Sequence, residues 1–449
     1  MTSDEIPTPA KKKPDIKLVA STSSRDARAD TDLPLNNDFA YLKSAQWSDP
    51  SPLSCLMCLL LTKLFRTADG TTLITSSSDL IISSYVLPED LLAPKDEPLH
   101  LDPQGKLALP EPSNTIAPAP YFSLGTPYTQ TVLVGSRDIP IQLYHALPDP
   151  TQPEGSAFPQ PIVASYPLIK PQTEEYLAPL SMLWPAPGTH FLTGTANLIS
   201  YFDITRTGEG PVLRIPTIPS TRHILKGGGV GMRGTVSALS AQTPDGNGGS
   251  LVAAGTWTRW VGLYDFAKAG ECVATWGVER SVDETATDKS APIGGTGIMQ
   301  TIWSPCGRYL VVNERRSTGM LVYDVRVTGK MLGWLAGRDA ESTQRLTCDV
   351  YPGSGDGGGF EVWAGTRDGT AKVWEGVGSR EGAHEPSWDW KAYDSATGST
   401  AMHPSGSVVA TCSGSWTYLD EDDRPYKRIM GTSELNVWSI GLPEPDTPA

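Results

Sequence analysis

The stretch GIMQTIWSPCGRYLVVNERRSTGMLVYDVR, residues 297–326, decides the fold. It contains two alternating apolar runs, 298–302 and 309–311, joined by the turn at residues 304–307, and a third run that ends at Tyr323 and Asp324. Short alternating runs with tight turns between them predict three antiparallel strands. A three-stranded meander exposes an apolar face that it cannot bury alone, so we expect neighbouring units of the same kind.

The third strand of this unit, an alternating run closed by an aromatic residue, recurs along the chain at nearly even spacing. Differences between residue numbers give successive spacings of 59, 58, 62, 59, 51 and 64 residues. Small sheets repeated about an axis are typical of a β-propeller. We therefore predict an all-β, seven-bladed WD-repeat-type β-propeller, with six blades as the alternative. The seven aromatic closers are Tyr85, Tyr144, Phe202, Tyr264, Tyr323, Trp374 and Trp438.

The period is longer than the roughly 40 to 45 residues of a compact WD repeat, so the blades must carry long loops. The ranges rich in Pro, Gly, Ser and charge are 88–118, 145–161, 205–233, 278–296, 376–396 and 417–432.

The two ends of the chain are polar and flank the predicted propeller, which we place at residues 36–442. Residues 1–35 and 443–449 are predicted to be disordered tails. The Lys11–Lys13 cluster fits a nuclear import signal or a solvated tail equally well. Within the first tail, residues 16–19 alternate like a strand, and we expect this strand to close the ring of blades.

One segment of the first blade, residues 49–67, differs from every other loop. It reads DPSPLSCLMCLLLTKLFRT, and its removal would leave QWSADGTTLITSSSD, an ordinary blade sequence. We predict that this anomalous insertion is an unspliced intron translated in frame. A membrane-touching or partner-binding loop is the alternative.

Catalytic motifs are not found in the sequence. The glycine-rich run 226–231 lacks the Gly-Lys-Ser/Thr ending of a phosphate loop, the six histidines are dispersed, and no cysteine pair beyond Cys55 and Cys58 has metal-ligand spacing. Few, scattered cysteines fit a reducing compartment, and the apolar run 53–65 is too short to span a bilayer. We expect a non-enzymatic protein with no cofactor, no metal, no small-molecule substrate and no membrane contact.

The distribution of arginine is the most informative feature for function. On a propeller, the turns from the second to the third strand and the loops before each inner strand open on one face. The chain has a formal net charge of −14, so a basic patch on that face would be a local positive region on a protein that is negative overall. Arginine binds phosphate and stacks on bases, so basic residues interleaved with tryptophan predict an RNA-binding surface. Pairing of these arginines with turn aspartates such as Asp138 and Asp368 is the structural alternative. The predicted RNA-binding residues are Arg137, Arg233, Trp257, Arg259, Trp260, Arg315, Arg316, Gln344, Arg345 and Arg367.

The chain resembles the telomerase Cajal body protein family, WD-repeat proteins that bind small Cajal-body RNAs. The likeness lies in FAYLKSAQW followed by DGTTLITSSSDLIISSYVLP, in LVAAGTWTRWVGLYDF, in TQRLTCDV with GTRDGTAKVWE, and in TGSTAMHPSGSVVATCSG. The family's Gly-His pair before the fifth blade is absent, since residues 292–295 read PIGG. The resemblance implies a seven-bladed propeller that recognises box H/ACA-type small nuclear or telomerase RNA.

Two functions follow as expectations. The first is an RNA-binding scaffold that assists ribonucleoprotein trafficking and telomere maintenance, with ribonucleoprotein proteins as further partners, in Cajal body-like bodies of the nucleus and also in the cytoplasm. The alternative is a protein-interaction propeller of the spliceosome and small nuclear ribonucleoprotein machinery.

Overall fold

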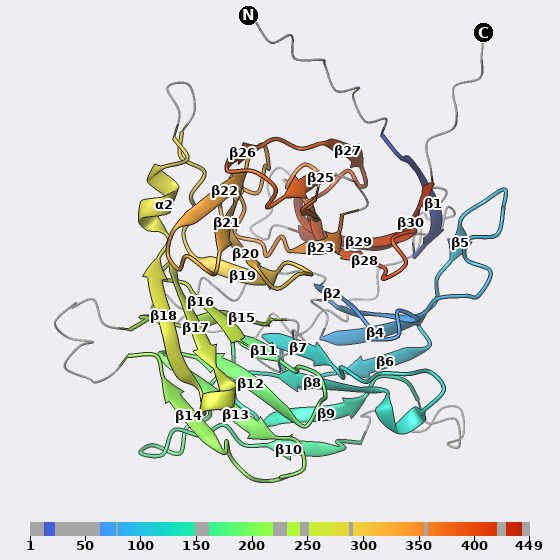
Figure 1. Cartoon of the computed structure of the whole chain (residues 1–449). Helices are drawn as coiled ribbons and strands as arrows, with labels where there is room; N and C mark the ends of the chain where they lie inside the picture. The colour runs from blue at the N-terminus through green and yellow to red at the C-terminus, as the bar shows by residue number, and fades with distance from the viewer. Residues whose placement is uncertain are drawn as a thin grey trace, which may run out of the picture.

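The computed structural model describes residues 13–22, 63–77, 80–148, 161–218, 231–242, 251–286, 291–353, 358–419 and 428–441. Figure 1 shows these residues as β-sheets arranged in a ring. They form seven sheets, and their only α-helix is the short α2 (Glu279–Asp283). No helix in this part of the chain is long and apolar enough to cross a membrane. The predicted seven-bladed propeller is confirmed, and the six-bladed alternative is wrong.

The stretch that suggested the fold forms three strands of the fifth blade, β19 (Ile298–Trp303), β20 (Tyr309–Glu314) and β21 (Met320–Asp324), and β22 (Met331–Leu335) completes it. The turn between β19 and β20 is held locally. The N–H of Gly307 donates to the Ser304 carbonyl at 2.9 Å, and Ser304 Oγ accepts from the N–H of Tyr309 at 3.0 Å. Gly307 has a φ of +69°, a left-handed conformation that favours glycine.

The other blades repeat this antiparallel order from the axis outward. Blade one contains β2 (Lys63–Arg66), β3 (Thr72–Ser76), β4 (Ile81–Val86) and β6 (Gly105–Ala108), and blade two contains β7 (Thr115–Pro118), β8 (Thr131–Gly135), β9 (Ile141–His145) and β10 (Ala164–Tyr166). Blade three contains β11 (Ser181–Leu183), β12 (His190–Thr195), β13 (Leu198–Asp203) and β14 (Leu213–Pro216), and blade four contains β15 (Val236–Ala241), β16 (Leu251–Thr256), β17 (Trp260–Asp265) and β18 (Glu271–Gly277). Blade six contains β23 (Cys348–Pro352), β24 (Phe360–Gly365), β25 (Thr370–Val377) and β27 (Trp388–Lys391). Every aromatic closer lies on the third strand of its blade, as the spacing predicts.

The seventh blade closes the ring with a strand from the start of the chain. It contains β28 (Thr397–Met402), β29 (Val408–Leu419), β30 (Arg428–Gly441) and β1 (Asp15–Ser21). β1 pairs antiparallel with β30, with Leu18 opposite Trp438. The predicted closing strand is confirmed, so residues 15–21 belong to the ring although they fall within the range predicted as a tail. Residues 1–12, 23–35 and 443–449 lie outside the described residues.

Two blades gain a fifth strand from a neighbour's long loop. β5 (Leu99–His100), from blade one, pairs parallel with β1 of blade seven, and β26 (Gly382–His384), from blade six, pairs parallel with β22 of blade five. An added strand satisfies the outer edge of a sheet, which would otherwise expose unpaired backbone groups. It also links adjacent blades beyond their shared hydrophobic core.

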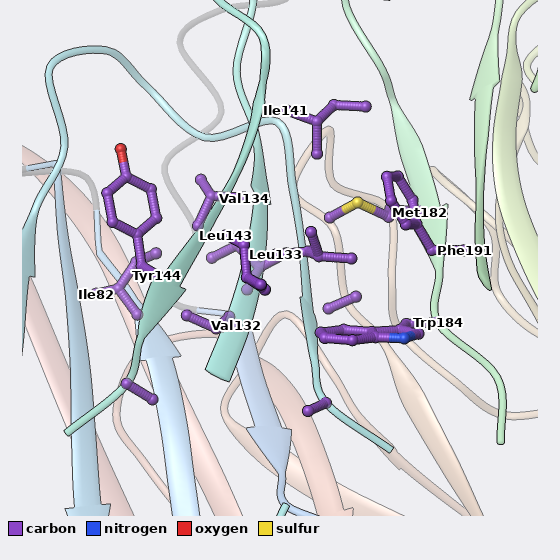
Figure 2. Close-up of a cluster of buried hydrophobic side chains, with 14 of the residues drawn as sticks. Ile82, Val132, Leu133, Val134, Ile141, Leu143, Tyr144, Met182, Trp184 and Phe191 are labelled. Carbon is purple, nitrogen blue, oxygen red and sulfur yellow. The ribbon is translucent and has the colours of Figure 1, made fainter. Parts of the chain in front are cut away.

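Apolar side chains fill the spaces between blades. Figure 2 shows one such cluster, in which Ile82 of blade one, Leu133 of blade two and Phe191 of blade three are buried together. Nearer the axis, polar side chains link successive inner strands. Ser181 Oγ donates to the Val236 carbonyl at 2.8 Å, and Gln300 Nε2 donates to the Cys348 carbonyl at 2.7 Å.

Several expectations about loops need correction. The ranges 88–118, 205–233 and 376–396 contain strands of the blades: β5 to β7, β14, and β26 with β27. Residues 63–66 of the anomalous 49–67 segment form the inner strand β2, with Phe65 opposite Ile74. Residues 49–62 lie outside the described residues, so the intron interpretation stays a prediction. The range 417–432 is not simply a loop, because β29 and β30 stay paired as far as Leu419 and Arg428.

Candidate functional site

The turns and loops that carry the predicted site residues lie at one end of the blades. The N–H of Arg315, in a turn, donates to Gly297 before β19 at 3.0 Å, and the N–H of Trp257 donates to Thr235 before β15 at 3.1 Å. Such bonds join turns between second and third strands to loops before inner strands. We call this end the arginine face, defined by turns 136–140, 257–259, 315–319 and 366–369 and by loops 231–235 and 336–347.

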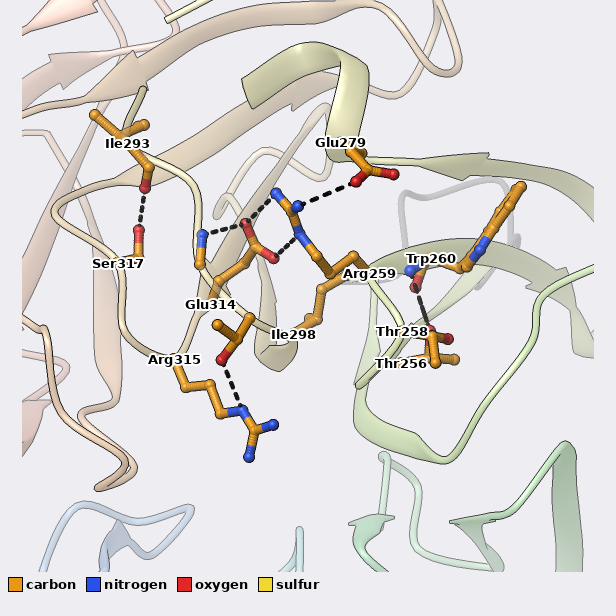
Figure 3. Close-up of polar contacts among 12 residues, drawn as sticks. Thr256, Thr258, Arg259, Trp260, Glu279, Ile293, Ile298, Glu314, Arg315 and Ser317 are labelled. Atoms are coloured by element: carbon orange, nitrogen blue, oxygen red, sulfur yellow. Dashed lines mark hydrogen bonds and ion pairs between the residues drawn. The ribbon is translucent and has the colours of Figure 1, made fainter. Parts of the chain in front are cut away.

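Arg259 is held in an ion pair. Its Nε donates to Glu314 Oε1 at 2.8 Å and its Nη2 to Oε2 at 3.3 Å, while Glu279 lies 3.9 Å away (Figure 3). Glu314 also accepts the N–H of Gly295 at 3.1 Å, and its side chain is 3% exposed. A bidentate, largely buried pair of this kind is structural. Arg259 therefore joins blades four and five, and its guanidinium already has a partner.

Arg315 and Trp257 form the one arginine–tryptophan contact of the arginine face among the described residues. The guanidinium carbon lies 5.6 Å from the centre of the Trp257 ring, and Nε donates to Thr296 Oγ1 at 3.1 Å. Burial, and to a smaller extent the charge of the neighbouring Arg316, lower the pKa of Arg315. Arg316 itself is exposed. The pair presents a cation stacked on an aromatic ring beside a second, accessible cation.

Trp260 contributes to the packing between blades. It begins β17, is half-buried, and packs against a cluster that includes Ile199, Met232 and Tyr264 between blades three and four. Trp260 directly follows the turn 257–259 and this packing covers part of its ring, so its role as a stacking surface stays a prediction. Its packing role explains an aromatic residue there without a ligand.

Gln344 and Arg345 lie in the loop before β23. Gln344 Nε2 donates to the Gly414 carbonyl at 3.3 Å, which links this loop to blade seven. Arg345 turns toward the axis, and its Nη2 donates to the carbonyl of Leu180, before the inner strand of blade three, at 3.2 Å. Burial lowers the pKa of Arg345 to about 10, so the group remains charged at neutral pH.

The remaining arginines are more accessible. Arg137 and Arg367 are exposed, and Arg233 is half-buried. Arg367 pairs with Asp339 at 3.2 Å rather than with the turn residue Asp368, which accepts from Thr366 and Thr370 instead. The alternative prediction pairs Arg367 with the turn residue Asp368. Arg367 is indeed paired with an aspartate, but that aspartate is Asp339.

A cavity of about 600 Å³ opens beside Arg367, between blades five and six. Its charged and aromatic lining residues are Trp334, the carboxylates Asp339, Glu341 and Glu385, and the arginines Arg338 and Arg367. Asp339 is paired with Arg367, so Glu341 and Glu385 are the carboxylates left to a ligand. Carboxylates around an aromatic side chain suit a cationic ligand better than an RNA phosphate. The arginine face therefore includes an acidic recess as well as basic turns.

Two functional residues were not predicted. Glu314 fixes Arg259, and Arg338, 1% exposed, donates to the carbonyl of Gly365, to Asn313 Oδ1 and to the carbonyl of Leu346 at 2.7 to 3.0 Å. Both lie in the stretches that carry predicted arginines, but most of their partners come from other parts of the fold: Arg259 for Glu314, and Asn313 and Gly365 for Arg338. No local sequence signal distinguishes them from exposed charges.

Within the described ranges, no group of three or more His, Cys, Asp or Glu side chains could hold a metal ion. The Cys55 and Cys58 pair lies outside those ranges.

No protein-family model matches the chain. The human protein named telomerase Cajal body protein 1 is 25% identical over 402 residues, which cover 85% of this chain and 64% of the human protein. The rat protein of the same name is 24% identical over 356 residues, 77% of this chain and 57% of its own length. The chain is similar to the telomerase Cajal body proteins. The resemblance predicted from the sequence is confirmed, although the match spans less than two thirds of these mammalian relatives.

The chain is also similar to a yeast protein whose name does not refer to telomerase. The Schizosaccharomyces pombe protein named guanine nucleotide-binding protein negative regulator 1 is 23% identical over 379 residues, 83% of each chain. Similarity of this extent supports a shared WD-repeat propeller scaffold.

Proposed function

We propose that this protein is a non-enzymatic RNA-binding scaffold of ribonucleoproteins, which holds box H/ACA-type or telomerase RNA on its arginine face. It would act in Cajal body-like bodies of the nucleus, in ribonucleoprotein trafficking and telomere maintenance. The observation that carries the proposal is the stack of Arg315 on Trp257 beside the exposed Arg316, in a chain of net charge −14. The names of the mammalian relatives support the same assignment.

The chemistry of this surface fits a single-stranded RNA loop. Unstacked bases pack on aromatic rings and guanidinium planes, and phosphates bind exposed arginines. The Arg315–Trp257 pair would receive a base, and Arg316, Arg137 and Arg367 would contact the backbone. Arg233 and Gln344 flank this surface. Arg259 would act indirectly, because its ion pair with Glu314 fixes the turn that carries Trp257.

The test is crosslinking and sequencing of RNA bound to the tagged protein in its own cells. The informative variant is Arg315→Glu with Arg316→Glu. Its matched control is Arg206→Glu with Arg326→Glu, which makes the same charge change at exposed positions after the third strands of blades three and five. Arg259 is left intact, since its loss would disturb folding.

We expect H/ACA guide or telomerase RNA to be enriched with the natural protein and the control, and to be lost from the Arg315/Arg316 variant. Equal RNA recovery from both variants would contradict binding by the arginine face. No RNA above background from the natural protein would contradict the function itself.

A protein-interaction role in the spliceosome and small nuclear ribonucleoprotein machinery is the second candidate. The acidic recess with Trp334, Asp339, Glu341 and Glu385 favours it, because such a surface suits a basic protein segment. Substitution of Glu341 and Glu385 by Gln should then remove splicing proteins from the purified complex and leave RNA recovery unchanged. Unchanged protein recovery would count against this candidate.

A further inference from the structure

Arg345 connects opposite sides of the ring. It precedes β23 of blade six, whereas its acceptor, the Leu180 carbonyl, precedes β11 of blade three. Blades four and five separate these positions along one side of the ring, and blades seven, one and two along the other. A hydrogen bond between them must therefore pass near the axis. The guanidinium of Arg345 lies at the centre of the arginine face.

This guanidinium is poorly satisfied in comparison with its neighbour Arg338. Arg338 makes three hydrogen bonds, each from a different nitrogen, including one to Leu346, the residue that follows Arg345. Arg345 makes one side-chain hydrogen bond to the described residues, although a guanidinium has five N–H donors. Within the described part of the chain, Arg338 is therefore better satisfied than the half-buried Arg345, whose remaining N–H donors have no acceptor there.

The charge of Arg345 also lacks a counter-ion among the described residues, where no carboxylate lies within ion-pair distance of it. Three carboxylates near this loop have other partners: Glu314 binds Arg259, Asp339 binds Arg367, and Asp349 accepts the N–H of Met402 at 2.7 Å. Glu341, in the same loop, is exposed and lines the recess between blades five and six. A partly desolvated cation without a counter-ion is unfavourable unless a ligand supplies one.

We propose that Arg345 is the anion-binding residue of a phosphate site at the axis of the arginine face. The unused N–H donors match two oxygens of a phosphate group in a bidentate arrangement. The phosphate belongs either to a bound RNA or to a free phosphate ion. The site does not depend on RNA binding, so it can be tested separately from the proposed function.

The first experiment measures the thermal midpoint of the full-length protein while inorganic phosphate replaces chloride at constant ionic strength. A ligand that binds the folded state raises this midpoint in a saturable way. We compare the natural protein with Arg345→Met, which keeps the aliphatic length, and with Arg316→Met, an exposed arginine of the same face. Arg345→Lys keeps the charge but loses the bidentate geometry.

We expect phosphate to stabilise the natural protein and Arg316→Met in a saturable way. Arg345→Lys should bind phosphate with an apparent affinity at least about tenfold weaker, and Arg345→Met should not be stabilised at all. If Arg345→Met does not fold, the natural protein and Arg345→Lys still decide the question. No saturable effect on the natural protein, or equal effects on the natural protein and Arg345→Lys, would overturn the proposal.

The second experiment separates the two sources of phosphate. Binding of a single-stranded RNA oligonucleotide is measured with and without saturating inorganic phosphate at constant ionic strength. If an RNA phosphate occupies the site, inorganic phosphate weakens RNA binding to the natural protein but not to Arg345→Met. If a free ion occupies it, RNA affinity is the same with and without phosphate. Failure of RNA to bind at all would contradict the proposed function and leave the outcome of the phosphate titration intact.

Discussion

At the scale of single residues, the arginine face contains two kinds of arginine. Arg259 and Arg338 are engaged by acceptors from other parts of the fold and hold blades together. Arg316 lies on the surface, where a ligand can reach it. The distinction matters for mutagenesis, because loss of the first kind alters folding and loss of the second alters binding.

Glu314→Gln should destabilise the protein. The substitution removes the charge opposite Arg259 while one amide oxygen remains as an acceptor, so a partly buried guanidinium loses its counter-ion. We expect the free energy of unfolding to fall by about 2 kcal/mol, measured by urea titration.

The matched control for Glu314→Gln is Asp324→Asn, which removes the charge opposite the exposed Arg326 and should cost less than about 1 kcal/mol. Equal effects of the two substitutions would show that the Glu314 pair adds little.

Asp349 predicts a pH-dependent change in stability. Burial raises the pKa of this carboxyl on the inner strand β23, and the Met402 N–H and, to a smaller extent, Arg66 partly offset the rise. A folded-state pKa above the unfolded value of 3.8 means that stability falls as pH rises from 3.8 through the folded pKa, and the loss persists above it. Asp349→Asn can still accept the Met402 N–H, so it should be more stable than the natural protein at pH 7.

Thermal midpoints of both forms between pH 4 and 8 check this, and the gain should shrink toward pH 4. A variant that is less stable at every pH would show that the carboxylate charge is favourable where it lies.

At the scale of elements, the ring depends on strands contributed from distant parts of the chain. β1 completes blade seven, and β5 of blade one covers the outer edge of β1. The start of the chain therefore lies between blade seven and a loop of blade one. Removal of β1 would leave the outer edge of β30 and the paired edge of β5 without a neighbouring strand.

Deletion of residues 1–22 should open the ring at blade seven. The loss of β1 leaves the outer edge of β30 unpaired, and unpaired edges destabilise a sheet and promote association. We expect the thermal midpoint to fall by roughly 5 °C or more, with protease cleavage within residues 397–441. Deletion of residues 1–12, which retains β1, is the control and should change neither measurement. Equal behaviour of the two truncations would mean that β1 contributes little to closure.

The segment 49–67 gives a prediction about the inner strand of blade one. If it is an unspliced intron, its removal takes away β2, and residues up to Ser48 must supply the inner strand in its place. The shortened chain should then fold with a thermal midpoint at least as high as that of the full chain. Transcript sequencing across Ser48 to Ala68 should find mature message without the segment. A message that always contains it, together with a shortened chain that does not fold, would contradict the intron interpretation.

At the scale of the whole molecule, the sequence predicts the repeated blades but does not predict the contacts between residues of different blades. The seven closers and the strand at residues 16–19 were predictable, because each depends on a local alternating pattern and a regular period. The pairing of Arg259 with Glu314 and the reach of Arg345 to Leu180 were not, because they join residues 55 and 165 positions apart. Which arginines are available to a ligand is therefore a property of the assembled ring.

The electrostatics of the whole molecule give the prediction that separates its two candidate functions. A chain of net charge −14 repels a polyanion overall, so RNA binding must come from local phosphate contacts that release counterions. For single strands the logarithm of the binding constant falls with the logarithm of salt concentration by about 0.7 per phosphate contact, so three or four contacts predict a slope of about −2 to −3. Arg315→Glu with Arg316→Glu should flatten the slope by about 0.7, because Arg316 is one of the phosphate contacts whereas Arg315 receives a base.

The binding of RNA to the natural protein, this variant and the Arg206/Arg326 control should be measured from 50 to about 300 mM salt. A slope that the variant leaves unchanged would place the phosphate contacts elsewhere. A protein partner held mainly by aromatic anchors, such as Trp334 of the recess, should show a much flatter dependence, since buried apolar contacts release few ions. The salt slope thus tells whether the basic turns or the recess between blades five and six provide the main binding surface.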